Sequence, residues 1–137
     1  MSNTTRWIIG LTLISLVTIE YGGTFLLSVL SGEMSALGLT EFQRGMFRAG
    51  HAHAGVLVLL GLIGQQLVDH LRVGPILPIR VGLVAAPLLV SGGFFAAAIG
   101  RGLTAPNSAL PILWLGVVIL GLTVLALGVS LIRSRSP

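Results

Sequence analysis

The sequence has no cysteine, no lysine and few acidic residues. The absence of cysteine excludes disulfides, thiolate metal sites and cysteine nucleophiles. Only 9% of the 137 residues are charged and 54% are hydrophobic, whereas soluble domains carry about 25% charged residues. Because no amphipathic pattern would hide so much apolar surface from water, the composition predicts a membrane protein.

All the basic residues are arginines, and with only four acids the formal net charge is +4. The arginines stand at the ends of apolar runs, where such residues anchor a segment to lipid headgroups. Nothing in their distribution resembles a basic surface for nucleic acid. We therefore expect the lipid bilayer as a partner and no nucleic acid.

Four apolar runs have the length of a membrane span, for which about 20 helical residues cross about 30 Å of hydrocarbon. They cover residues 7–30, 46–68, 79–99 and 111–132, and turn residues fill the gaps between them. The first run is too long for a signal-peptide core and has no cleavage pattern after it. The prediction is an all-α, integral membrane, four-helix transmembrane bundle that forms a single domain over residues 1–137.

Glycine is abundant, with 19 residues, several of them inside the predicted spans. Small residues let helix backbones approach closely in a membrane, where van der Waals contact replaces hydrophobic drive. Four short helices also enclose little volume, so we expect the chain to associate with copies of itself as a homo-oligomer. Thr40 and Gln43 form a capping-box pattern, which predicts that the second helix begins before its membrane span.

The arginines also predict a topology, since cytoplasmic loops carry an excess of positive charge. One side of the membrane receives five of them and the other side three: Arg6, Arg72, Arg80, Arg133 and Arg135 against Arg44, Arg48 and Arg101. The prediction is a multi-pass protein of a bacterial-type inner (plasma) membrane with both termini in the cytoplasm.

Costly polar side chains lie inside two of the spans. Arg48, His51 and His53 open the second span, and Glu20 lies about 15 Å before the end of the first. Ionisable residues at such depths usually have a function. Because the first span ends where the second begins, we expect Glu20 to lie near the histidines and to orient one of them through a hydrogen bond.

The residues leave the chemistry of this site open between a cofactor, a metal ion and a proton. Residues two apart on a helix point about 200° away from each other, so one ion cannot easily take both histidines. The leading hypothesis has His51 and His53 as ligands of haem or a divalent metal, with Glu20 as an orienting residue or third ligand. Arg48 and Arg101 would bind anionic groups of the cofactor.

If haem is bound, electron transfer or small-molecule redox chemistry is the expected task, with a redox partner that the sequence does not identify. An alternative function is a proton or metal-ion permease in which Glu20 and the histidines form a relay. Whether the protein is an enzyme stays open.

The run Gly-His-Ala-His-Ala-Gly at residues 50–55 resembles segments that open a helix in the family of haem-copper oxidase catalytic subunits, including small relatives with few spans. The resemblance implies that His51 or His53 is an axial ligand of a b-type haem and that Arg48 and Arg101 contact its propionates. The additional histidines of a copper centre are missing, so oxygen reduction is not implied. A second axial ligand would be the other histidine, Met46 or a residue of another subunit.

A second resemblance rests on the arginines near Gln43 and near Pro106. Gln43-Arg44, Arg48-Ala49 and Gly100-Arg101 resemble the membrane-associated proteins of eicosanoid and glutathione metabolism, which are trimers that bind glutathione between subunits. The Asn and Glu expected after the arginine are replaced by histidines and glycine. The resemblance implies a third alternative, a glutathione-dependent transferase-like trimer, in which Tyr21 or Arg101 would have to activate the thiol.

Overall fold

The computed structural model describes residues 1–33 and 38–134. Its four helices are α1 (Asn3–Leu30), α2 (Glu41–Val68), α3 (Ile76–Ala97) and α4 (Leu110–Arg133). Each is long and apolar enough to cross a membrane. The protein is therefore an all-α, multi-pass membrane protein with a four-helix bundle, which confirms the predicted fold class.

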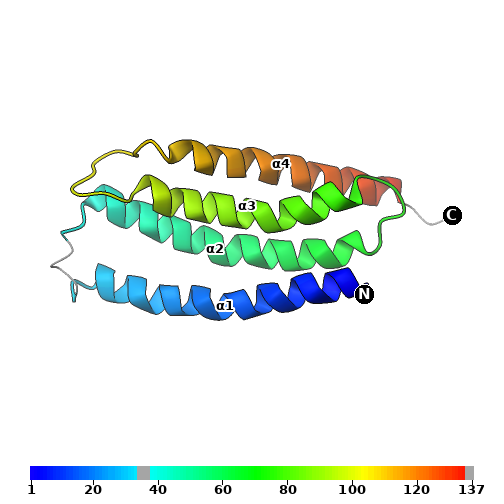
Figure 1. The fold of residues 1–137 in the computed structure, drawn as a ribbon, viewed down its shortest axis with the longest axis horizontal. Coiled ribbons are helices and arrows are strands. Elements are labelled where there is room, and N and C mark those ends of the chain that lie inside the picture. The colour runs from blue at the N-terminus through cyan, green and yellow to red at the C-terminus, as the bar shows by residue number, and fades with distance from the viewer. Residues whose placement is uncertain (34–37, 135–137) are drawn as a thin grey trace.

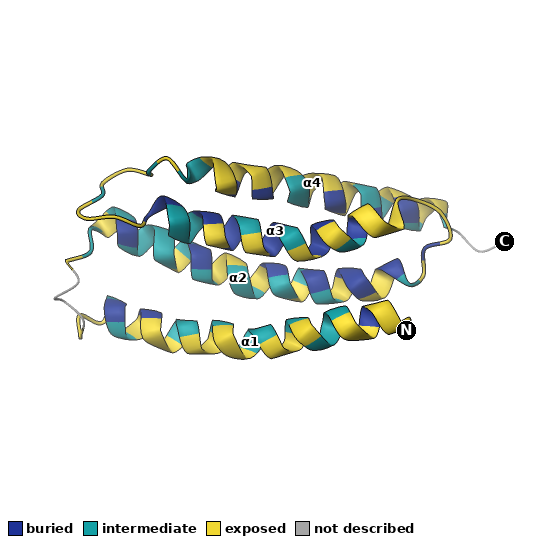
Figure 2. Ribbon diagram, viewed as in Figure 1, coloured by how far each residue is buried: buried dark blue, intermediate teal, exposed yellow. Residues whose placement is uncertain are grey.

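The helices lie side by side in chain order, and successive helices run in opposite directions (Figure 1). The α3–α4 pair packs most extensively and α2 packs well on α3, whereas α1 packs mainly on α2. Buried residues concentrate where α2, α3 and α4 meet, and α1 is largely exposed (Figure 2). Helix α1 is thus the most loosely held element, at one edge of the bundle. The start of α1 and the end of α4 lie at the same end of the bundle, which we call the end where the termini lie.

The helices begin before the predicted spans because their first turns lie outside the apolar runs. At α2, the Thr40 hydroxyl accepts a hydrogen bond from the Gln43 amide, and the Gln43 side chain accepts one from the Thr40 amide. This reciprocal pair confirms the predicted capping box. Pro111 lies in the first turn of α4. Backbone N–H groups in the first turn have no carbonyl partner within the helix, so a proline there costs no hydrogen bond.

Glycines bring the backbones of α3 and α4 together. A Cβ at Gly93 would lie 2.5 Å from the backbone of Leu113, and one at Gly116 would lie 2.7 Å from the Val90 nitrogen. These close contacts show the backbone approach expected from glycines inside the predicted spans. The adjacent Gly92 has no atom within 4 Å of its Cβ position and takes no part in this contact.

A polar cluster around Asp69 holds α1 at the end of the bundle where the termini lie. The Asp69 carboxylate accepts hydrogen bonds from Arg80 Nη2, Thr5 Oγ1 and the Ser2 amide, each at 2.7 Å. Arg80 Nη1 also donates to Thr5 and to Gln65. Burial raises the pKa of the Asp69 carboxyl, but the hydrogen bonds from Ser2, Thr5 and Arg80 outweigh it and hold this pKa well below its usual range.

The opposite end of the bundle is held by Gln43. Its Nε2 donates to the carbonyls of Ala98 and Gly100, at 2.9 and 2.8 Å, where α3 has ended and no helical amide remains to pair with them. Thr40 bonds to the Leu103 carbonyl in the same region. The start of α2 is therefore tied to the end of α3 and to the segment that follows it.

Candidate functional site

An apolar pocket of about 490 Å³ lies between α1, α2 and α3, in the half of the bundle away from the termini. Its size is that of typical small-molecule sites. The lining residues come from three helices, the segment before α2 and the segment after α3: Thr18, Ile19, Gly22, Phe25, Leu26, Val29, Leu39, Phe47, His51, Ala54, Phe95 and Ile99. We call this the His51 pocket, because His51 is the ionisable residue in its lining.

The His51 imidazole extends from α2 onto α1. Its Nε2 is 2.9 Å from the position that a Cβ of Gly23 would occupy, so the ring fills the space that this glycine leaves. The next glycine, Gly22, lines the pocket itself and has no atom within 4 Å of its Cβ position. The absence of a side chain at Gly22 thus leaves space in the pocket, and the absence of one at Gly23 leaves room for the His51 ring.

His51 differs from the other two histidines in its hydrogen bonding. Nδ1 of His53 bonds to the Ala49 carbonyl at 2.7 Å, and Nδ1 of His70 bonds to the Gln66 carbonyl at 3.1 Å. Within the described part of the chain, neither ring nitrogen of His51 has such a partner. An unpaired polar group in apolar surroundings is unfavourable, so His51 has hydrogen-bonding capacity to offer to a ligand.

Aromatic rings form part of the pocket wall. Phe47 and Phe95 stack with their centroids 5.8 Å apart and their planes inclined by 30°. Phe25 of α1 lines the pocket as well, and Thr18 and His51 are the polar side chains of the lining. Such a surface can hold a flat, mainly apolar molecule that offers a polar atom to the imidazole.

His53 points elsewhere and is exposed. Its ring lies beside Phe94 of α3, with the centroids 4.9 Å apart. Because the Ala49 carbonyl can only accept, Nδ1 carries the proton of neutral His53 and Nε2 has a free lone pair. The two imidazoles therefore face α1 and α3 respectively, in agreement with the angular separation expected for residues two apart on a helix.

The other predicted site residues, Glu20 on α1, Arg48 on α2 and Arg101 after α3, are exposed. Across residues 1–33 and 38–134 no hydrogen bond or ion pair joins any of them to a histidine, and no three His, Asp or Glu side chains are grouped so that they could hold a metal ion. The predicted Glu20–histidine metal site stays a prediction without support from these contacts.

One feature of the site and one feature of the fold were not predicted from the sequence. The contribution of α1 to the His51 pocket was missed, although the Gly22-Gly23 pair is a signal that α1 approaches another element closely there. Arg80 was treated only as a topology signal, and its ion pair with Asp69 was missed. Asp69 and Arg80 lie on the two sides of the turn between the second and third spans, and this spacing could have predicted an ion pair between them.

Comparison with protein-family models, with curated proteins and with solved structures finds no match to this chain, so the two family resemblances remain predictions.

Proposed function

We propose that the protein binds a lipid-soluble small molecule in the His51 pocket and that His51 holds the polar head of this molecule. The observation that carries the proposal is a half-buried imidazole in an apolar pocket, without a hydrogen-bond partner in the described chain. A ring nitrogen without a partner, at the edge of an apolar pocket, favours a ligand that offers it a hydrogen bond. A ligand oxygen can either accept from or donate to the His51 imidazole.

The lining supports one chemical class in particular. Phenylalanine rings favour a flat ring system, and the remaining apolar side chains favour a hydrocarbon tail. A single imidazole suits a single oxygen-bearing head group, either a carbonyl or a hydroxyl. Membrane quinones combine these three properties, so we propose a quinone-like molecule as the ligand.

Haem does not fit this pocket through His51 Nε2. That nitrogen lies against Gly23, where a single added carbon would already be within 2.9 Å of it. An iron atom and a porphyrin ring need considerably more space on the same side of the imidazole. The His51 pocket therefore supports a hydrogen-bonded ligand and not a haem on that nitrogen.

Thermal unfolding of the detergent-purified protein with and without decylubiquinone tests the proposal. The quinone should raise the melting temperature of the wild type in a concentration-dependent way. Gly22→Leu should abolish the shift because its side chain fills the pocket, whereas Gly128→Leu on α4, which also has open space, should keep it. His51→Ala should weaken binding by up to about tenfold, and His53→Ala and His70→Ala should leave it unchanged. Equal shifts in wild type and Gly22→Leu would contradict the proposal.

A second candidate function, haem binding, is favoured by one observation at His53. A histidine that donates its Nδ1–H to a backbone carbonyl is held in the tautomer that presents Nε2 to a metal, and ligating histidines usually make such a bond with their other ring nitrogen. Haem, when bound, supplies one-electron redox chemistry. Because His53 is exposed, a second copy of the chain would have to cover the other face, which agrees with the expected homo-oligomer.

An absorption spectrum separates the two candidates. Haem binding through His53 predicts a Soret band that is lost in His53→Ala and kept in His51→Ala. The band should also be kept in His70→Ala, a matched control because His70 Nδ1 bonds to a backbone carbonyl as His53 Nδ1 does. A protein that carries no Soret band after incubation with haem and removal of the unbound haem by gel filtration would exclude the second candidate. It would leave quinone binding unaffected.

We also propose that both termini lie on the cytoplasmic side of a bacterial-type inner membrane. The start of α1 and the end of α4 lie at one end of the bundle (Figure 1). The described arginines are distributed four to three between that end and the other: Arg6, Arg72, Arg80 and Arg133 against Arg44, Arg48 and Arg101, with Arg135 outside the described residues. Two C-terminal fusions test the orientation. If the C-terminus is cytoplasmic, a fusion to green fluorescent protein should be fluorescent and a fusion to alkaline phosphatase should be inactive; the reverse pattern would contradict the proposal.

A further inference from the structure

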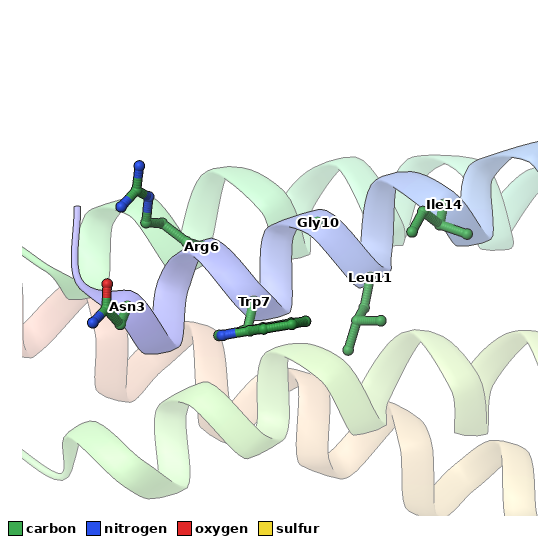
Figure 3. A pocket seen from close by; sticks show the side chains of 6 residues that line it. All are labelled: Asn3, Arg6, Trp7, Gly10, Leu11 and Ile14. Carbon is green, nitrogen blue, oxygen red and sulfur yellow. The ribbon is translucent and has the colours of Figure 1, made fainter.

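A second groove, of about 370 Å³, runs along the exposed side of α1 at the end where the termini lie. It is lined by Asn3, Arg6, Trp7, Gly10, Leu11 and Ile14 (Figure 3). Gly10 lies between Arg6, which extends to one side of the helix, and Trp7 and Leu11, which extend to the other (Figure 3). The glycine therefore forms the floor of the groove and the longer side chains form its walls.

The apolar part of the groove reaches through most of one leaflet of a bilayer. From Trp7 to Ile14 the helix rises by about 10 Å, and half of a typical hydrocarbon core is about 15 Å. The polar residues Asn3 and Arg6 are at the helix terminus, and the apolar ones follow toward the middle of the span. Trp7 stands between the two groups, as expected for an aromatic residue at the membrane interface.

Charge at this end of the bundle favours an anionic occupant. The acid there, Asp69, is already engaged by Arg80, Thr5 and Ser2. Within the described residues Arg6 forms no ion pair, and its side chain is exposed beside the groove. A guanidinium with free donors binds phosphate in bidentate fashion.

We propose that this groove binds an anionic phospholipid. Arg6 and Asn3 hold the phosphate, and an acyl chain lies over Gly10 between Arg6 and Trp7 and continues to Leu11 and Ile14. The groove is separate from the His51 pocket, which is lined by the other half of α1. A negative result for one site therefore does not affect the other.

Native mass spectrometry of the delipidated full chain, mixed with equal amounts of phosphatidylglycerol and phosphatidylcholine, tests the proposal. The wild type should retain phosphatidylglycerol in preference to phosphatidylcholine. Arg6→Gln should lower that preference by about fivefold, the effect of one basic residue near an anionic surface. Gly10→Leu should lose the bound lipid, since the side chain would occupy the groove, and its Cβ has no atom within 4 Å to clash with.

Two matched controls decide the outcome. Arg133→Gln removes an arginine from the same end of the bundle, and Gly22→Leu adds the same bulk elsewhere on α1, so both should bind phosphatidylglycerol like the wild type. Equal losses in Arg6→Gln and Arg133→Gln would show diffuse attraction and overturn the proposal. Unchanged binding in Gly10→Leu would overturn it as well.

Discussion

His51 of α2 lies directly against Gly23 of α1, at a point where any side chain on α1 would collide with the imidazole. Helix α1 packs mainly against α2, and this contact and the hydrogen bond from Thr5 to Asp69 at the other end are two of the points where α1 meets the bundle. The same contact forms one side of the His51 pocket. Packing of the loosest helix and the shape of the candidate site therefore depend on the same pair of residues.

Gly23→Ala should change the site more than the stability. The added carbon meets the end of a side chain that can rotate away, and alanine favours the helix by up to about 1 kcal/mol. We expect a melting temperature close to that of the wild type but altered quinone affinity, because the imidazole is displaced. Gly22→Ala, which has open space, should retain wild-type affinity. A large drop in melting temperature for Gly23→Ala would contradict this account of the contact.

Gly93→Ala and Gly116→Ala should both destabilise the bundle. Here the added carbon meets the backbone of Leu113 or Val90, which cannot rotate away, so α3 and α4 must separate. We expect a loss of about 1–3 kcal/mol, as for other overpacked interfaces. Gly121→Ala, on α4 with nothing within 4 Å, is the control and should match or exceed the wild type in a thermal melt.

Acid should weaken the attachment of α1. The pKa of Asp69 is lowered in the folded protein, so its contribution to stability is present above the ordinary aspartate pKa of about 3.9 and is lost as the pH falls below it. Asp69→Asn should lower the melting temperature at pH 7, and the difference from wild type should shrink as the pH falls below about 4. A difference that stays constant over this range would show that the ion pair with Arg80 does not stabilise the fold.

Gln43→Leu should loosen the other end of the bundle. The buried amide pairs with the carbonyls of Ala98 and Gly100, and removing it leaves both without a donor among the residues that the structure describes. The expected cost is about 1–3 kcal/mol. Gln66→Leu, which replaces an exposed glutamine on the same helix, should change the melting temperature little. Equal effects of the two substitutions would contradict the role of the Gln43 bonds.

The four helices could be predicted because membrane spans leave strong, local signals in the sequence. Runs of apolar residues, the capping box at Thr40 and Pro111 each depend on neighbours within a few positions. Helix ends were predicted less accurately, since the first turns of α1 and α2 lie outside the apolar runs and carry polar side chains. Hydropathy reports the part of a helix inside the lipid and not its full length.

The candidate site could be predicted only in part. His51 and His53 are conspicuous by their polarity within an apolar run, and helix geometry correctly indicates that they point apart. Which imidazole borders a pocket depends on how α1 and α3 pack around α2, and no local pattern encodes that packing. The Asp69–Arg80 pair was missed for a related reason, because the topology rule uses only the number of basic residues on each side of the membrane and not the contacts between side chains.

The most direct test of the central claim, that His51 binds a ligand in its pocket, is the ¹⁵N spectrum of the protein labelled at its three histidines and embedded in bilayers. Addition of decylubiquinone should shift the ring-nitrogen resonances of His51, assigned by His51→Ala, and leave those of His53 and His70 in place. Unchanged His51 resonances at saturating quinone, or a shift confined to His53 or His70, would contradict the claim.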